Sequence, residues 1–193
     1  LDLLPEPDRN DPDLARLSAD REGLKKEIFE RLKAKGERAT PALVEKELAR
    51  IERLAAALAA IRAVEAAGGT GHWYAGDLRD ASRVGEIVAA VKERSAKVDV
   101  LLHGAGLEIS RFLKDKEPKE FDLVFDVKAD GFFNLLKALD STPIGATVAF
   151  SSVAGRFGNG GQTDYSSAND LLCKLSSSFR TTRPGTRGLA LDW

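Results

Sequence analysis

The sequence predicts an α/β fold with a doubly wound parallel sheet, preceded by a charged helical segment. After residue 67, short runs of β-branched and aliphatic residues alternate with apolar repeats at helical spacing. Strict alternation of strand and helix is typical of right-handed crossovers, which place the strands parallel in one sheet. The first 66 residues, in contrast, hold 27 charged residues but only two of the 17 glycines.

Residues 1–67 are expected to form a loop followed by two helices. Residues 5–12 are rich in Pro, Asp and Asn, which favours an exposed loop. Apolar residues then recur at helical spacing over 14–32 and over 44–61, and Thr40 and Pro41 supply an N-cap and a first helical residue for the second run. Because the apolar stripes are short, we interpret this charged pair as a solvated surface element and not as a partner-binding coiled coil.

The same patterns place each element after residue 67. Strands are expected at 72–75, 98–102, 147–150 and 188–193, and helices at 81–94, 120–139 and 162–182. In such a sheet, ligands bind beyond the carboxyl ends of the strands.

Four polar residues are candidates for a site beyond the carboxyl ends of these strands. Ser152 closely follows the strand at 147–150, and Tyr165 comes 13 residues later, near the start of the next helix. Asn169 is four residues further on the same helix face. Lys128 lies 37 residues before the tyrosine, in the helix after the preceding strand.

The motifs around these residues resemble a known family. They read Lys128-Ala-Asp-Gly131, Phe150-Ser-Ser152, Gly158-Asn-Gly-Gly-Gln162 and Tyr165-Ser-Ser-Ala-Asn169. They are similar to those of the ketoreductase domains of modular polyketide and polyunsaturated fatty acid synthases, in the short-chain dehydrogenase/reductase superfamily. The superfamily usually places its lysine four residues after the tyrosine and an asparagine on the preceding helix. The synthase ketoreductases exchange the two, and this chain has the exchanged order.

The resemblance implies a partial Rossmann-like fold in which 1–67 are a loop and helical-pair insert and 68–193 are the catalytic half. It also implies NADPH-dependent reduction of a β-ketoacyl thioester, presented by an acyl carrier protein among other synthase domains, to a β-hydroxyacyl thioester. A phenol is a poor proton donor unless a cation stabilises its phenolate, and a hydroxyl can polarise a carbonyl. We therefore expect Tyr165 as general acid, Lys128 as electrostatic activator, Ser152 as carbonyl binder and Asn169 as positioner of Lys128 or a water.

Further residues match the family's cofactor contacts. Asp77 and Leu78, after the strand at 72–75, match the adenine contact, and the turn Gly104-Ala105-Gly106 matches the turn beneath the cofactor, where small residues admit a ribose. A turn-forming aspartate and a merely tight turn are the alternatives.

No glycine cluster completes the turn that holds a pyrophosphate at a helix N-terminus. The chain begins at Leu1 and contains no methionine. We therefore expect a fragment, truncated at both ends, that binds cofactor poorly and is inactive alone. In a 3-2-1-4-5-6 sheet the missing strands would separate 72–75 from 98–102, so either 72–75 shifts across or both edges stay unpaired.

Composition excludes several other classes of function. A net charge of −1 disfavours binding to nucleic acid or anionic membranes, and no stretch is long enough to span a bilayer. One cysteine, Cys173, allows neither an internal disulfide nor a multi-thiolate zinc site, and we expect a cytoplasmic protein without a metal centre. Cys173 and His103 are interpreted as packing residues. The alternatives to the synthase reductase are a free-standing short-chain reductase acting on a small carbonyl compound and a non-catalytic ketoreductase-like fragment.

Overall fold

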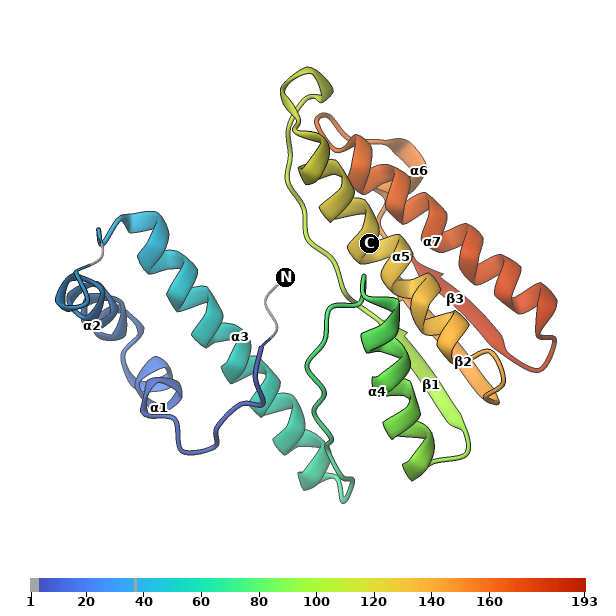
Figure 1. Cartoon of the computed structure of the whole chain (residues 1–193), viewed down its shortest axis with the longest axis horizontal. Coiled ribbons are helices and arrows are strands. Elements are labelled where there is room, and N and C mark those ends of the chain that lie inside the picture. Colours follow the sequence, from blue (N-terminus) through green and yellow to red (C-terminus); the bar gives the residue numbers. More distant parts are fainter. Residues whose placement is uncertain (1–3, 37) are drawn as a thin grey trace. The chain divides into compact units, whose positions relative to one another are not determined.

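The computed structural model describes residues 4–36 and 38–193. The chain forms two compact units, Leu1–Ala75 and Gly76–Trp193, here called the helical unit and the sheet unit (Figure 1). The assignment of residues 1–67 as an insert of a larger domain stays a prediction.

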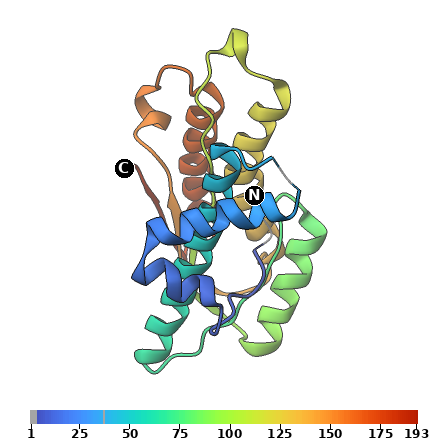
Figure 2. The same ribbon diagram turned by 90° about the vertical axis from the view of Figure 1, so that its left-hand side faces the viewer.

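Among its described residues, the helical unit contains three helices and not two. They are α1 (Pro12–Ala19), α2 (Arg21–Ala34) and α3 (Pro41–Ala66), and Figure 2 shows the blue α1 and α2 lying across α3. The prediction of one helix over 14–32 was wrong, because Asp20 ends α1 in a non-helical conformation and its side chain accepts a hydrogen bond from the Gly23 amide as the N-cap of α2. The second predicted helix is confirmed: Thr40 accepts from the Leu43 amide and Pro41 begins α3.

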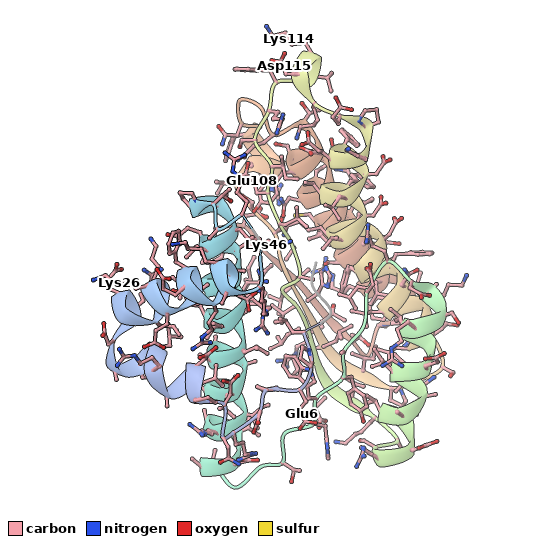
Figure 3. All side chains as sticks on the ribbon, turned by 60° about the vertical axis from the view of Figure 1, so that its left-hand side comes forward. Glu6, Lys26, Lys46, Glu108, Lys114 and Asp115 are labelled. Atoms are coloured by element: carbon pink, nitrogen blue, oxygen red, sulfur yellow. The ribbon has the colours of Figure 1, made fainter. Side chains whose placement is uncertain are left out.

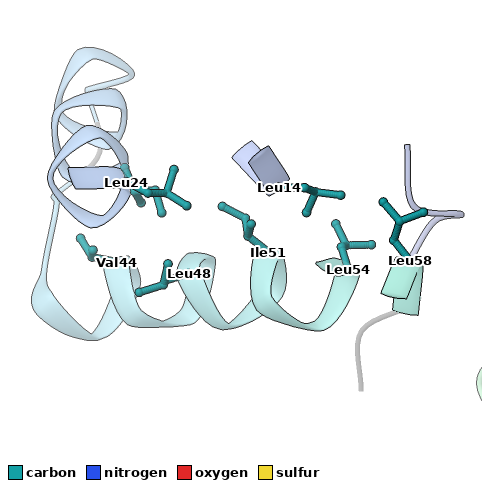
Figure 4. Close-up of a cluster of buried hydrophobic side chains, with 8 residues drawn as sticks. Leu14, Leu24, Val44, Leu48, Ile51, Leu54 and Leu58 are labelled. Atoms are coloured by element: carbon teal, nitrogen blue, oxygen red, sulfur yellow. The ribbon is translucent and has the colours of Figure 1, made fainter. Parts of the chain in front are cut away.

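The apolar stripes of the three helices meet in a core of their own (Figure 4). Charged residues lie around this core in exposed ion pairs, such as Arg31 with Asp13 and Arg21 with Glu52. The buried residues of the core are Leu14, Leu24, Ile28, Val44, Leu48, Ile51, Leu54 and Leu58.

The sheet unit confirms the predicted α/β class. Its strands are β1 (Val98–His103), β2 (Ile144–Phe150) and β3 (Arg187–Leu191), parallel and in the order β1-β2-β3. The main helices are α4 (Ala81–Arg94), α5 (Pro118–Ala138) and α7 (Thr163–Thr182). A 3-10 turn, η1 (Leu113–Asp115), and a short helix, α6 (Ala154–Phe157), lie in the connections.

The predicted strand at 72–75 is not formed. These residues have no regular structure, and the Trp73 indole donates a hydrogen bond to the Leu4 carbonyl oxygen at 3.3 Å. A strand needs a hydrogen-bonded neighbour, and β1 pairs only with β2 within the described residues. Both expected outcomes assumed a strand at 72–75, so neither applies, and among the described residues the outer edge of β1 has no strand partner.

The three long helices of the sheet unit, α4, α5 and α7, lie on one face of the sheet, as Figure 1 shows. His103, Thr147 and Ala149 point to this face and are buried. On the other face, Val100, Leu102, Phe150, Leu189 and Leu191 are exposed apolar residues. At the carboxyl ends of β1 and β2, one face of the sheet is therefore covered by helices and the other face exposes apolar residues.

Candidate active site

Lys128 is the central charge of the site. It lies on α5, its residue is 5% exposed, and its Nζ donates to the Phe150 carbonyl oxygen at 3.0 Å, just where β2 ends. Nζ also lies 5.3 Å from the centroid of the Tyr165 ring, a distance at which a cation is attracted to an aromatic face. Burial lowers the pKa of Lys128 from its usual value, because desolvation disfavours the charged form.

Neighbouring residues hold Lys128 in this place. A Cβ added to Gly106 would lie 2.7 Å from the Lys128 Cε, so a side chain at this position would displace the end of the Lys128 side chain. His103 Nε2 lies 2.9 Å from the Lys128 carbonyl oxygen, and its ring stacks on Phe132 at 5.0 Å. Burial lowers the pKa of His103 to about 4, and since a carbonyl only accepts, the neutral ring carries its proton on Nε2. The interpretation of His103 as a packing residue is confirmed.

Two hollows meet at Tyr165. The lysine-side hollow, about 290 Å³, is lined by Gly104, Gly106, Leu107, Lys128, Phe150 and Trp193. The serine-side hollow, about 550 Å³, is lined by Ser152, Val153, Ala154, Gly158, Asn159 and Gln162. Both are also lined by Tyr165 and by Glu108, which is labelled in Figure 3 on the segment after β1. Tyr165 therefore has access to two adjoining spaces, with a cation beside only one of them.

The two serines after β2 are placed differently. Ser151 is fully buried, and its Oγ donates to the Asn169 carbonyl oxygen at 3.0 Å. Ser152 lines the serine-side hollow; its Oγ accepts from the Ala154 amide at 3.2 Å and donates to the Trp193 carbonyl oxygen at 3.4 Å. Of the two serines, only Ser152 thus lines a hollow beside Tyr165.

Asn169 is buried one turn after Tyr165 on α7. Its Nδ2 donates to the Tyr165 carbonyl oxygen at 2.8 Å, while its Oδ1 is buried without a partner among the described residues. The structure brings Asn169 to Tyr165, but the acceptor of the Lys128 ammonium is the Phe150 carbonyl. A direct bond from Asn169 to Lys128 is absent from the described contacts.

The predicted adenine contacts lie along α5, away from both hollows. Asp77 forms an ion pair with Arg79 at 2.6 Å, and the hydrogen bonds of this pair hold the pKa of Asp77 below its usual value. Asn134 donates to the Leu78 carbonyl oxygen at 2.9 Å, and a Cβ on Gly131 would lie 3.0 Å from the Leu78 Cβ. Ala105 lies within the turn but does not line either hollow.

Several residues around Tyr165 were missed by the sequence reasoning. Gln162 Nε2 donates to Ser110 Oγ at 3.2 Å, and Ser110 in turn donates to Glu108, so a polar chain joins the segment after β1 to the turn before α7. Gln162 belongs to a motif that carried the resemblance, but no sequence signal pairs it with Ser110. Phe150 and Trp193 line the lysine-side hollow, but the sequence reasoning assigned neither of them to the site.

The described residues contain no cluster of three or more metal-ligating side chains, and none of their helices is long and apolar enough to cross a membrane. Cys173 is half-buried on α7, with its Sγ 3.4 Å from both Ser151 Oγ and Asp192 Oδ1. Burial raises the pKa of its thiol, which does not favour a nucleophile.

A parallel sheet with a buried lysine over a tyrosine ring at its carboxyl edge defines the class: an α/β protein with the short-chain dehydrogenase/reductase fold. The KR domain family model matches residues 22–193, and the chain belongs to this family of ketoreductase domains.

Several of the curated relatives are large synthases. A polyunsaturated fatty acid synthase polypeptide from a Thraustochytrium species is 33% identical over 144 residues, which cover 72% of this chain and 5% of that protein. Polyketide synthase GfsA from Streptomyces halstedii is 34% identical over 117 residues, covering 61% of this chain and 2% of that protein. The chain thus spans only a small part of each of these two synthases.

Solved structures agree with this membership. An N-terminal ketoreductase from the macrolactin assembly line is 25% identical with a TM-score of 0.64, covering 69% of this chain and 27% of that one. A ketoreductase domain from the bacillaene assembly line is 25% identical with a TM-score of 0.61, covering 78% of this chain and 34% of that one.

Proposed function

We propose that this chain belongs to a reductase that uses NADPH to reduce a β-ketoacyl thioester to a β-hydroxyacyl thioester. The observation that carries the proposal is the buried Lys128 ammonium, 5.3 Å from the centroid of the Tyr165 ring where the two hollows meet. A phenol beside a desolvated cation is suited to give up a proton, which is the step a developing alkoxide requires.

The proposed chemistry divides between the hollows. The hydride that the carbonyl carbon accepts would come from the nicotinamide of NADPH. Ser152 exchanges its long 3.4 Å hydrogen bond to the Trp193 carbonyl for one to the substrate oxygen, where negative charge develops. Tyr165 delivers its phenolic proton to that oxygen, and Lys128 stabilises the resulting phenolate. Asn169 fixes the backbone of Tyr165 through its bond to the tyrosine carbonyl.

The residues fit only part of a dinucleotide. Gly104 and Gly106 add no side chains of their own to the lysine-side hollow, which leaves room beside the end of β1 for a ribose and a nicotinamide. Asp77 and Leu78 are proposed to contact the adenine. A pyrophosphate-binding glycine turn is missing from the sequence. We therefore propose that the 193-residue chain alone binds NADPH weaker than micromolar and turns over negligibly.

The proposed setting is a cytoplasmic multidomain synthase in which an acyl carrier protein presents the thioester. The relatives that support this setting are named as synthases. The term intact reductase denotes the synthase polypeptide that carries these residues together with a pyrophosphate-binding turn.

The test compares substrates on the intact reductase. Carrier-bound β-ketoacyl thioester and a small free ketone are each supplied with NADPH, and product is measured by mass spectrometry. The proposal expects carrier-bound β-hydroxyacyl product formed faster than the small alcohol. Faster reduction of the free ketone would instead favour a free-standing short-chain reductase, and reduction of neither substrate would favour a non-catalytic domain.

A further inference from the structure

A buried ion pair includes Asp164, the residue that precedes Tyr165 in the chain. The side chains of Lys116 and Asp164 are each 1% exposed, and Lys116 Nζ lies 2.5 Å from Asp164 Oδ2. Neither residue lines the two hollows. The pair therefore does not meet the substrate or the cofactor in the proposed reaction.

The pair joins the two segments that form the walls of the site. Lys116 Nζ also donates to the Ile109 carbonyl oxygen at 2.7 Å, one residue beyond Glu108. Asp164 Oδ1 accepts a hydrogen bond from the Tyr165 amide at 2.9 Å, in the first turn of α7. One ammonium and one carboxylate thus connect the backbone beside Glu108 to the backbone of Tyr165, the two residues that both hollows share.

A backbone contact closes the same junction. The Arg111 amide donates to the Gly161 carbonyl oxygen at 2.9 Å. Gly161 has φ +75°, and a Cβ there would lie 3.2 Å from the Arg111 carbonyl carbon, so both its conformation and its packing call for glycine. The segment after β1 and the start of α7 are therefore held in close register.

Burial separates this pair from the other ion pairs of α7. Lys174 and Asp170, on the same helix, are 67% and 48% exposed and form an ordinary surface pair. The free-energy cost of desolvating two charges offsets much of the attraction between them, so a buried ion pair adds little to stability. The best-attested role of such a pair is to fix one arrangement of the chain.

We propose that Lys116 and Asp164 are positioning residues that set the place of the Tyr165 hydroxyl and the width of the gap between Tyr165 and Glu108. This inference rests on the proposed reductase function for its kinetic consequences, but its structural consequence can be measured without catalysis. Loss of the pair lets Tyr165 and the segment at 107–111 move relative to each other.

The first test uses the 193-residue chain and fluorine NMR. The chain has two tyrosines, Tyr74 in the helical unit and Tyr165 in the sheet unit, so fluorotyrosine labelling gives two signals that Tyr74→Phe assigns. The variants are Asp164→Asn, which keeps an acceptor for the Tyr165 amide, and Lys116→Met with Asp164→Asn, which leaves no unpaired charge. Lys174→Met with Asp170→Asn is the matched control, because it makes the same changes in the exposed pair.

The proposal expects the Tyr165 signal to shift or broaden in both test variants. The Tyr165 signal of the control variant and the Tyr74 signal of every variant should stay unchanged. It is overturned if the Tyr165 signal of a variant that still melts cooperatively is the same as in the wild type. It is also overturned if neither variant melts cooperatively, because the pair then acts on the stability of the whole unit.

The second test uses the intact reductase and its product. Misplacement of a reacting group by about 1 Å costs up to about 100-fold in rate, so kcat should fall at least about tenfold with little change in KM for NADPH. A wider gap also admits both faces of the ketone, so the ratio of the two hydroxyl configurations should move towards equality. Partial unfolding lowers the rate without changing that ratio, and an unchanged ratio in a slowed variant contradicts the proposal. A wild-type enzyme that shows no reduction, with a Tyr165 signal that still shifts, would refute the proposed function alone.

Discussion

The helical unit and the sheet unit use charge in opposite ways. The first 66 residues hold 13 basic and 14 acidic side chains, and their ion pairs, such as Arg31 with Asp13, lie on the surface of an apolar core. The sheet unit is less densely charged but buries Lys116, Asp164 and Lys128 at the carboxyl edge of its strands. In the proposed reductase, the candidate site is therefore marked by buried charges and not by a high density of charge.

The largest effect is expected from removing the buried cation of the site. Lys128→Met should lower kcat of the intact reductase by about 100-fold or more, because the Tyr165 phenolate loses its stabilising ammonium. Lys119→Met, at an exposed position on the same helix, is the control and should change kcat by less than about twofold. Equal values of kcat for the two variants in a reduction assay would show that the buried lysine matters no more to the reaction than the exposed one.

In the helical unit, the largest effect should come from an apolar residue. Leu48 is fully buried in the core of α1, α2 and α3. Leu48→Ala should lower the free energy of unfolding by about 2–5 kcal/mol, through lost burial and the cavity left behind. Urea denaturation followed by circular dichroism measures this, and a change below about 0.5 kcal/mol would show that the helical unit does not depend on its core.

His103 links the stability of the sheet unit to pH. Its pKa is about 4 in the folded chain and 6.5 in the unfolded chain, so the unfolded state binds more protons between these values. Stability should therefore be full above about pH 6.5 and decline as the pH falls, by about 2 kcal/mol at pH 5. Urea denaturation at pH 7 and pH 5 measures the loss. His103→Gln should reduce it, and an equally steep decline in that variant would assign it to other groups.

The smallest effect is expected at a surface ion pair. Arg31 forms two hydrogen bonds to the Asp13 carboxylate, at 2.7 and 2.8 Å, but about half of its side chain is in water. Arg31→Met should change the free energy of unfolding by less than about 1 kcal/mol, and 0.5 M salt should have little further effect. A loss of several kcal/mol on urea denaturation would show that exposed charges also stabilise this unit.

Most elements of the sheet unit could be predicted from the sequence, because burial on one face of a parallel sheet imposes clear apolar patterns. Two local predictions were wrong. The apolar spacing over 14–32 continues across Asp20, where capping by its side chain divides the helix. The run at 72–75 has strand composition, but whether it forms a strand depends on a neighbour that its own residues do not specify.

The candidate site was predictable where topology alone places residues. The position of Ser152 follows from the end of its strand, whereas the pairing of Lys128 with Tyr165 was expected from the family resemblance. The Lys116–Asp164 pair spans 48 residues, and the contact of Gln162 with Ser110 spans 52, so both depend on the exact register of loops. No periodicity or motif in the sequence encodes such pairings.

The central claim is that the buried charges of the sheet unit act through Tyr165. The two tyrosines of the chain allow one direct measurement: kcat for reduction of a carrier-bound β-ketoacyl thioester by the intact reductase with Tyr165→Phe and, separately, with Tyr74→Phe. The account predicts a loss of about 100-fold or more for Tyr165→Phe and a change of less than about twofold for Tyr74→Phe. A wild-type rate in the folded Tyr165→Phe variant would contradict it.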